Sequence, residues 1–267
     1  RTKVVTCVLN RTIAIINNKG GVGKTTCTAG LATALAEKNY KVLVIDTDPQ
    51  GNLSRLFGFE PKEDIEKSLF NCLNNKLKNE PKKSSDFINH TDNPNIDILI
   101  GDINLTANRI EVERALAKFN FVYKKIIDEI KREDNYDFIL VDTCPSLGGE
   151  NSQILVAVQY VIIPSTTGRN SIEGIDQLID FYNNCREVNG DLTLLGVILN
   201  NVNMNSSIAK DIVPMIREAY GDYIFNTIIE RSVVAEKLEW NGIKPARNKI
   251  YNAFVDVTEE VLKKIGE

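Results

Sequence analysis

A glycine-rich segment near the start of the sequence reads Asn17-Asn18-Lys19-Gly20-Gly21-Val22-Gly23-Lys24-Thr25-Thr26. It follows a β-branched run and precedes a stretch rich in alanine, so we expect it to join a strand to a helix. Glycines allow the backbone N–H groups of such a loop to turn inward around an anion, and the helix N-terminus adds partial positive charge. The segment therefore predicts a phosphate-binding loop for a nucleoside triphosphate.

Two side chains of this segment have expected roles toward the phosphates. Lys24 should reach the β- and γ-phosphates, and the hydroxyl of Thr25 should coordinate Mg²⁺. The usual pattern G-x-x-x-x-G-K-[ST] is not fully met, because Asn18 occupies its first glycine position and a second lysine, Lys19, lies inside the loop. A glycine-rich turn without a ligand is the alternative, which the Lys-Thr-Thr sequence disfavours. The residues predicted to bind the nucleotide here are Gly20, Gly21, Val22, Gly23, Lys24, Thr25 and Thr26.

Two further segments place carboxylates after apolar runs. Asp46 and Asp48 follow the run at residues 42–45, and Asp142 follows the run at residues 138–141. In open α/β sheets ligands bind beyond the carboxyl ends of the strands, so these side chains should face the phosphates and hold Mg²⁺ or orient the attacking water. Alone, Asp-x-Asp-Pro is as typical of a turn, and an aspartate after four apolar residues is common. Beside the lysine loop, both segments predict catalytic or metal-side carboxylates.

Short β-branched runs recur along the chain, with helical patterns between them. Several lack polar alternation, which is typical of strands buried on both faces of a parallel sheet. The alternation of strand and helix over the whole length predicts one doubly wound α/β domain, with a mainly parallel sheet and helices on both faces, spanning residues 1–267. The expected strands are residues 12–17, 41–46, 97–100, 137–142, 160–164, 194–200 and 223–229.

Apolar residues at helical spacing predict two amphipathic helices. The first stripe is Leu116, Phe119, Tyr123, Ile126, Ile127 and Ile130. The second, near the C-terminus, is Phe254, Val257, Val261 and Ile265. The helix after Lys24 is rich in small residues, which would let it pack close against the sheet. The polar stretch at residues 71–95 is expected to be an insertion or surface loop.

Composition limits the class of protein further. The chain has 267 residues, of which 43% are hydrophobic and 25% charged, and this argues against a wholly disordered or collagen-like chain. No apolar run approaches the ~20 residues needed to cross a bilayer and no signal-peptide core is visible, so we expect a soluble, unexported protein. A formal net charge of −4 argues against coating nucleic acid with the whole surface, but a local basic patch is compatible with it.

The cysteines show no metal-ligand spacing. No two of them form a C-x-x-C pair, and the sequence has one histidine. A zinc site or a disulfide framework is therefore not expected, and buried thiols in a reducing cytoplasm are the simpler interpretation. The five are Cys7, Cys27, Cys72, Cys144 and Cys185.

The three motifs at residues 19–26, 46–52 and 141–148 together resemble those of the ParA/Soj partition family, the deviant Walker A ATPases. The resemblance continues through shorter stretches and covers roughly residues 12–262. It implies a P-loop NTPase fold and an ATPase of slow intrinsic turnover that is cytoplasmic and associates with the nucleoid when ATP is bound. Residues 165–170 depart from the family's pattern, in which a glutamate followed by aromatics is frequent at this point, so no role is carried over to them.

The resemblance also implies a role for each motif residue, with ATP and Mg²⁺ as the cofactors. Lys19 matches the signature lysine that reaches across an ATP-dependent homodimer to the partner's phosphates. Lys24 matches the phosphate-binding lysine, and Asp48 matches the aspartate needed for hydrolysis. Asp46 and Asp142 match the carboxylates on the metal side, where Thr25 also lies. Adenine contact at a strand end is implied for Asn200 and Asn201.

The region from residue 231 to residue 249 carries more basic than acidic side chains. Such a run is often only a solvated face, but the resemblance matches Arg231 to an arginine that binds nonspecific double-stranded DNA in the dimer. It also implies a ParB-like centromere-binding protein as the partner that stimulates hydrolysis. Lys237 replaces the family's usual alanine and adds charge. The predicted DNA-binding residues are Arg231, Lys237, Lys244 and Arg247.

Three related functions are alternatives. A MinD-like membrane positioner would need a basic amphipathic tail, whereas the C-terminal stripe has the pattern of a core helix, so no membrane partner is expected. A metabolic ATP-dependent ligase would need a dedicated substrate pocket, and the Asp-Pro-Gln-Gly-Asn motif argues against it. An iron–sulfur reductase would need a cluster shared across a dimer, for which Cys144 has no supporting cysteine context.

Overall fold

The computed structural model describes residues 10–61, 66–133, 135–168, 170–231 and 249–267. Within them, eight strands form one sheet in the order β3-β4-β2-β5-β1-β6-β7-β8, parallel throughout except for the antiparallel pair β3–β4. The mainly parallel, doubly wound class predicted from the sequence is confirmed. The strands are β1 (Arg11–Ile15), β2 (Val42–Asp46), β3 (Asn89–His90), β4 (Ile96–Leu99), β5 (Phe138–Asp142), β6 (Tyr160–Ser165), β7 (Thr193–Val202) and β8 (Ile229–Glu230).

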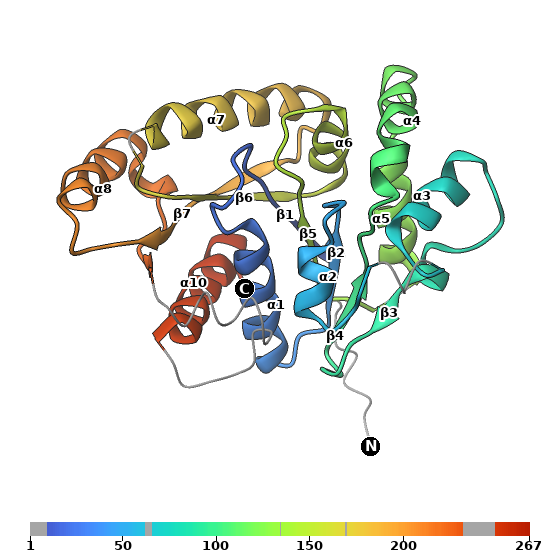
Figure 1. Ribbon diagram of the computed structural model, residues 1–267, viewed down its shortest axis with the longest axis horizontal. Coiled ribbons are helices and arrows are strands. Elements are labelled where there is room, and N and C mark those ends of the chain that lie inside the picture. The colour runs from blue at the N-terminus through green and yellow to red at the C-terminus, as the bar shows by residue number, and fades with distance from the viewer. Residues whose placement is uncertain (1–9, 62–65, 134, 169, 232–248) are drawn as a thin grey trace.

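Helices cover both faces of the sheet (Figure 1), with α1 and α10 on one face and α6, α7 and α8 on the other. Two short 3₁₀ helices, η1 (Ser84–Phe87) and η2 (Gly221–Tyr223), lie in connections. The α-helices are α1 (Lys24–Glu37), α2 (Asn52–Leu56), α3 (Leu69–Leu77), α4 (Leu105–Ala117), α5 (Val122–Glu133), α6 (Gly149–Ala157), α7 (Ser171–Val188), α8 (Ser207–Tyr220) and α10 (Lys249–Ile265).

The central strands are buried on both faces because successive side chains enter opposite cores. In β1, Ile13 and Ile15 pack into the core under α1 and α10, while Ala14 and the following Ile16 pack into the core on the other face. This is the physical reason for the absence of polar alternation in these runs.

The strand order brings the three sequence motifs to one edge. β5 lies between β1 and β2, so that Asp142 at its end is in register with both Ile15 and Asp46. The chain continues from all three strand ends into loops on the same side. The phosphate loop and both carboxylate segments therefore meet, as expected for the carboxyl edge of a parallel sheet.

The helix that follows the phosphate loop packs closely against the C-terminal helix. A Cβ added at Gly30 of α1 would lie 2.5 Å from the ring of Phe254, which is fully buried in α10. Small residues in α1 thus permit a close approach to α10 as well as to the sheet. The predicted C-terminal stripe is confirmed as core, because Phe254, Val257 and Val261 are buried and Ile265 packs against the same cluster.

Three predictions about local structure were wrong. The apolar stripe from Leu116 to Ile130 is not one helix: α4 ends at Ala117, Phe119 is exposed with φ of 53°, and α5 begins at Val122. Residues 71–95 contain most of α3, together with η1 and β3, rather than a loop alone. Of the expected strand at residues 223–229, only Ile229 lies in a strand, because 224–228 leave the sheet except for one bridge.

Candidate functional site

The phosphate loop connects β1 to α1 and is held at its start by Asn17. The Asn17 side chain donates to the carbonyl oxygen of Pro164 in β6 at 2.7 Å and accepts from the backbone N–H of Lys19 at 2.9 Å. Gly21 and Gly23 have φ values of 73° and 89°, a left-handed region in which side chains other than glycine are strained. Glycine at these two positions is therefore required by the course of the backbone.

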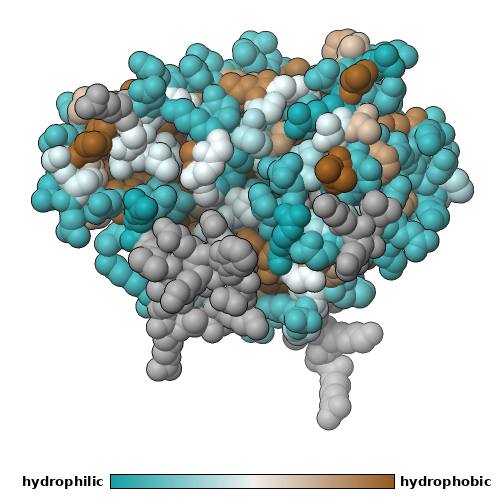
Figure 2. All heavy atoms as spheres, in the orientation of Figure 1, coloured by the Kyte–Doolittle hydropathy of each residue, from teal (hydrophilic) through white to brown (hydrophobic). Residues whose placement is uncertain are grey.

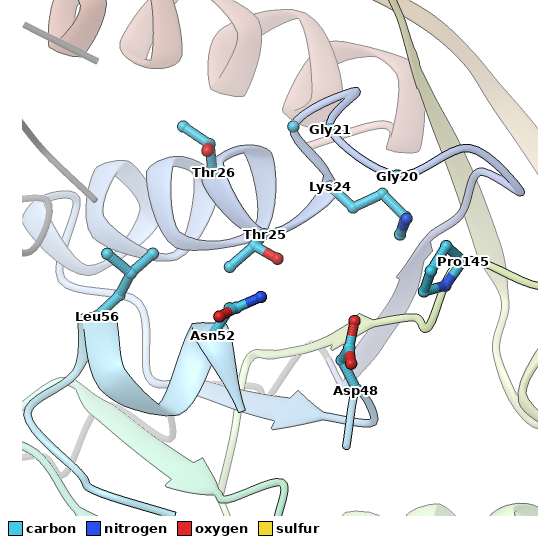
Figure 3. A pocket seen from close by; sticks show the side chains of 10 residues that line it. Gly20, Gly21, Lys24, Thr25, Thr26, Asp48, Asn52, Leu56 and Pro145 are labelled. Carbon is cyan, nitrogen blue, oxygen red and sulfur yellow. The ribbon is translucent and has the colours of Figure 1, made fainter. Parts of the chain in front are cut away.

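A cavity of about 340 Å³ lies between this loop, the loop after β2 and the loop after β5. Figure 3 shows the Lys24 amine, the Thr25 hydroxyl and the Asp48 carboxylate directed into this space, with Pro145 beside them. Lys19 is not part of the lining. The lining residues are Gly20, Gly21, Gly23, Lys24, Thr25, Thr26, Asp48, Asn52, Leu56 and Pro145.

Lys24 supplies a buried cation at the floor of this cavity. Its Nζ donates to the backbone oxygen of Lys19 at 3.2 Å, and only 7% of the residue is exposed. Burial lowers the pKa of its ammonium group, while the nearby Asp142, Asp48 and Cys144 raise it. A cation held in this way is ready for an anionic ligand, since phosphate oxygens would compensate the charge that burial disfavours.

Asp142 fixes the first turn of α1. Its Oδ2 accepts a hydrogen bond from the Thr25 hydroxyl at 2.8 Å, and its Oδ1 accepts one from the Thr28 hydroxyl at 3.3 Å. Burial and, to a smaller extent, the neighbouring Asp46 raise the pKa of this carboxyl to about 8, although the hydrogen bond from Thr25 opposes the shift. The carboxylate and the Thr25 hydroxyl together form an oxygen-rich corner beside the phosphate loop.

Asp46 is also fully buried, and its oxygens are engaged by the loop that follows it. Its Oδ2 accepts from the N–H and the hydroxyl of Ser54 at 2.9 and 2.7 Å, and its Oδ1 accepts from the N–H of Asp48 at 3.1 Å. Burial raises the pKa of this carboxyl to about 6. Asp46 thus ties α2 and the Asp48 loop to the end of β2, and its metal-side role stays a prediction.

Asp48 lies at the mouth of the cavity and is only half-buried. Its Oδ1 accepts from the backbone N–H of Gln50 at 2.9 Å. Gly51, with φ of 61°, turns the chain into α2 close to Pro61. The Asp-Pro-Gln-Gly sequence therefore forms a fixed turn whose carboxylate faces the space beside the phosphate loop.

Lys19 does not point into its own cavity. Its Nζ donates at 2.9 Å to the carbonyl oxygen of Asn170, which precedes α7, and its amine lies over Gly174 of that helix. Asn170 belongs to the segment at 165–170 that departs from the family's pattern. The two asparagines at the end of β7 differ in environment, since Asn200 is buried and Asn201 is exposed.

Two polar residues that sequence reasoning missed hold the loops of the site. Ser54, in α2, bonds to Asp46 and accepts from the N–H of Gly101 at 3.0 Å. Asn151, in α6, donates to the carbonyl oxygens of Cys144 and Ser146 at 3.0 and 2.6 Å and so fixes the loop after β5. A lone serine and a lone asparagine in helices have no local sequence signal, because their partners are brought together only by the fold.

Of the predicted DNA-binding residues, the structure describes Arg231 alone. Arg231 is exposed at the end of a described stretch, whereas Lys237, Lys244 and Arg247 lie outside the described residues, as does Cys7. The other four cysteines are buried free thiols, as expected. Across the described ranges no group of three or more His, Cys, Asp or Glu side chains could hold a metal ion by itself.

The sequence and the fold match known proteins over most of the chain. A family described as an AAA domain matches residues 10–194. The chromosome partitioning protein ParA of Caulobacter vibrioides is 30% identical over 84% of this chain and 81% of its own length, and the sporulation initiation inhibitor protein Soj of Bacillus subtilis is 29% identical over 95% and 98%. The chain belongs to the ParA/Soj family of partition ATPases.

Solved structures agree with this assignment. A putative plasmid partition protein of Borrelia burgdorferi bound to AMPPNP has a TM-score of 0.77 and 27% identity, covering 95% of this chain and 99% of that one. Cobyrinic acid a,c-diamide synthase of Mycobacterium smegmatis, with bound ADP and magnesium, has a TM-score of 0.79 at 24% identity, covering 95% and 94%. The cell division ATPase MinD of Pyrococcus furiosus has a TM-score of 0.74 at 23% identity, covering 95% and 99%. The last two show the fold alone.

None of the helices in the described ranges is both long and apolar enough to cross a bilayer. The face drawn in Figure 2 is mostly hydrophilic, and its apolar side chains lie in small separate groups.

Proposed function

We propose that this ParA/Soj-family ATPase is a DNA-partitioning switch that binds ATP with Mg²⁺. The ATP-bound form is a homodimer that binds double-stranded DNA without sequence preference, and hydrolysis stimulated by a ParB-like centromere-binding partner releases it. The observation that carries the proposal is the cavity in which Lys24, the Thr25–Asp142 pair and Asp48 converge. Membership of the partition family supports it.

The donor set at the floor fits a nucleotide with Mg²⁺. The backbone N–H groups of residues 20–26 and the Lys24 amine would hold the phosphates. The Thr25 hydroxyl donates a hydrogen bond to Asp142, which leaves the lone pairs of the hydroxyl oxygen available to bind a metal ion. Hydroxyl and carboxylate oxygens are hard donors of the kind that Mg²⁺ prefers, with waters and phosphate oxygens completing its shell. When bound, the ion neutralises charge that develops on the transferred phosphoryl group.

Asp48 is suited to orient the attacking water. Its carboxylate faces the cavity, and the Gln50 N–H and the Asp46-bound backbone hold it at the mouth. In the reaction the oxygen of water attacks the γ-phosphorus, the bond to ADP breaks, and the proton passes to Asp48 or to the departing phosphate. Lys19 would complete the site of the other subunit, which requires its amine to leave the Asn170 carbonyl.

The test is binding to nonspecific duplex DNA at low salt with ATP, with ADP and without nucleotide. We expect binding only with ATP, falling steeply as salt rises because released counterions drive it. The Lys24→Ala variant is the control, because it should lose nucleotide binding while it keeps the predicted DNA-binding residues from Arg231 onward. Intact ATP binding without DNA binding in any state would contradict the proposal and favour a MinD-like positioner, for which anionic lipid vesicles are the next surface, or a metabolic enzyme.

A further inference from the structure

Behind the loop that follows β5, a buried group of polar side chains joins that loop to the helices around it. Glu150, in the first turn of α6, is only 8% exposed. Its Oε1 accepts a hydrogen bond from the hydroxyl of the buried Tyr123 of α5 at 2.6 Å, and the Nε of Arg109 in α4 lies 3.9 Å from its Oε2. The thiol of Cys144, in the loop itself, lies 3.8 Å from the same Oε2. Burying a carboxyl group costs free energy unless hydrogen bonds compensate it, so these contacts determine where Glu150 can lie.

Tyr123 and Cys144 both keep their protons and therefore act as hydrogen-bond donors. Burial, followed by the charge of Glu150, raises the pKa of the Tyr123 hydroxyl well above its ordinary value. The same two causes raise the pKa of the Cys144 thiol to about 12. The thiol has a second acceptor within reach, the Oδ1 of Asn151 at 3.6 Å. Glu150 and Asn151 are neighbours in α6, so a bond from the thiol to either one ties the loop to the first turn of this helix.

The beginning of α6 is itself fixed by α4 and α5. The side-chain amide of the buried Gln153 donates to the carbonyl oxygen of Val112 in α4 at 2.8 Å and accepts from the N–H of Val122 in α5 at 2.8 Å. A Cβ added at Gly149 would meet a side chain of α4 at 3.1 Å, so α4 packs directly against this end of α6. Glu150 therefore contacts the loop after β5 from a fixed junction of three helices.

The loop reaches the cavity one residue after the thiol. Pro145, directly after Cys144, lines the cavity beside Lys24 and Asp48 (Figure 3). Proline has no backbone N–H, so Pro145 cannot be fixed by a hydrogen bond of its own donor. Its place depends on the bonds of Cys144, whose carbonyl oxygen accepts from the Asn151 side chain at 3.0 Å and whose thiol reaches the first turn of α6. A shift of Cys144 would therefore move the cavity wall next to Asp48.

Glu150 lies near the reacting groups without lining the cavity. Burial raises the pKa of its carboxyl, and the charge of Asp48 adds to this rise, so the two carboxyl groups are close enough to interact. We propose that Glu150, held by Tyr123, is a positioning residue for ATP hydrolysis that sets the place of the Cys144–Pro145 segment beside Asp48 and the attacking water. The inference rests on the proposed ATP hydrolysis. Because Lys24 and the phosphate loop bind the nucleotide, the effect of Glu150 is on the rate of hydrolysis rather than on affinity.

The experiment compares Tyr123→Phe with the wild type, because this change removes one hydroxyl and keeps the buried ring. We expect the single-turnover rate of ATP hydrolysis to fall about tenfold, since small misplacements near the reacting atoms slow a reaction, while the affinities for ATP and ADP with Mg²⁺ stay within about twofold. Tyr182→Phe is the matched control, because Tyr182 of α7 is also buried and donates to the carbonyl oxygen of Leu192 at 3.0 Å, outside the cavity lining. Both variants should lose similar thermal stability, but Tyr182→Phe should keep the wild-type rate.

Substitutions at Glu150 give a second measurement. Glu150→Gln keeps the shape of the side chain and an acceptor for Tyr123, so it should retain more of the hydrolysis rate than Glu150→Leu, which has no acceptor. Nucleotide affinity should be unchanged in both variants. Tyr123→Phe should cause no further loss of rate in the Glu150→Leu background, because Tyr123 acts through Glu150.

The outcomes separate positioning from a purely structural role. A wild-type rate of hydrolysis in Tyr123→Phe and Glu150→Leu, even with a lowered melting temperature, would overturn the inference. A loss of ATP and ADP affinity as large as the loss of rate would overturn it as well. Failure of the wild type to bind or hydrolyse ATP would instead remove the proposed function itself, and the inference with it.

Discussion

The buried floor of the cavity and its exposed mouth are built differently. Floor side chains already have partners within the chain, as in the bonds of Asp142 to Thr25 and Thr28. Mouth side chains are half-buried or exposed, and some, such as Asp48, present oxygens to open space. By the floor we mean Lys24 and the buried side chains near it, Thr28, Asp46, Asp142 and Asn200, and by the mouth the more exposed Lys19, Asp48, Asn52, Pro145 and Asn201; of these, Lys24, Asp48, Asn52 and Pro145 line the cavity itself.

This difference indicates which steps the single chain can perform alone. A floor whose polar groups are pre-arranged can bind phosphate without reorganising, which is the condition for strong electrostatic binding. The mouth, whose side chains are more exposed, depends on what arrives there: water, the base or a second subunit. Substitutions in the floor should therefore act on nucleotide binding, and those in the mouth on turnover and assembly.

The largest effect is expected from Lys24→Ala. Removing the Lys24 cation should weaken ATP and ADP binding by roughly 100-fold, because the charge-assisted hydrogen bonds to phosphate are lost. Asp142 would also stay buried without the positive charge of Lys24 beside it. Titration calorimetry measures it, with Lys38→Ala, at the exposed position directly after α1, as the matched control. Binding of ATP as in the wild type would disprove the assignment of the site.

Asp48→Ala tests the mouth. We expect ATP affinity close to that of the wild type and a turnover lower by roughly 100-fold, as is typical when a residue that handles the attacking water is removed. Phosphate release is the measurement, with and without DNA. Asp211→Ala, at an exposed position of α8 outside the cavity lining, is the control that should keep its turnover. Normal hydrolysis in Asp48→Ala would take Asp48 out of this role.

The floor carboxyls should make the nucleotide-free protein sensitive to pH. Burial raises the pKa of Asp142 to about 8 and that of Asp46 to about 6, whereas an unfolded chain has about 3.9. Between these values the folded state binds more protons than the unfolded state. The free energy of unfolding should therefore fall as pH rises from about 4 to about 8.

Thermal unfolding without nucleotide at several pH values in that range measures this fall. Asp142→Asn should reduce the dependence of the melting temperature on pH, because the asparagine amide does not titrate. Asp180→Asn, on the exposed face of α7, should keep the wild-type slope. A wild-type melting temperature that does not fall across the range would mean that the floor carboxyls are not held protonated.

The smallest effect on nucleotide affinity is expected from Lys19→Ala. The Lys19 amine bonds to Asn170 and lies outside the cavity lining, so ADP affinity should stay within about twofold of the wild type. ATP-dependent dimerisation, followed by light scattering, should instead be lost. A large loss of ADP affinity with dimerisation intact would show that Lys19 acts like a floor residue, and it would contradict the division between floor and mouth.

Much of the floor and of the sheet could be predicted because their signals are local. Apolar runs buried on both faces mark β1, β2 and β5, and the glycine-lysine segment marks the loop after β1 whatever the rest of the chain does. Asp142 was found because it directly follows such a run. Residue type and spacing suffice for features of this kind.

The remainder could not be predicted because it depends on backbone direction and on distant partners. The spacing of Leu116 and Phe119 fits a helix, but spacing does not show that the chain turns at Phe119, where φ is positive. Ser54 and Asn151 have partners that only the fold brings near. Asn200 and Asn201 are alike in sequence, and only the irregular end of β7 separates the buried amide from the exposed one.

The contact between Gly30 and Phe254 has a consequence for how the protein is made. α1, which follows the phosphate loop, precedes by more than 200 residues α10, which covers it, and so leaves the ribosome earlier. Until α10 has emerged, one face of the sheet and the back of α1 stay open to chaperones or to other nascent chains. The nucleotide pocket thus acquires its full support only after α10 has been synthesised, long after the phosphate loop itself.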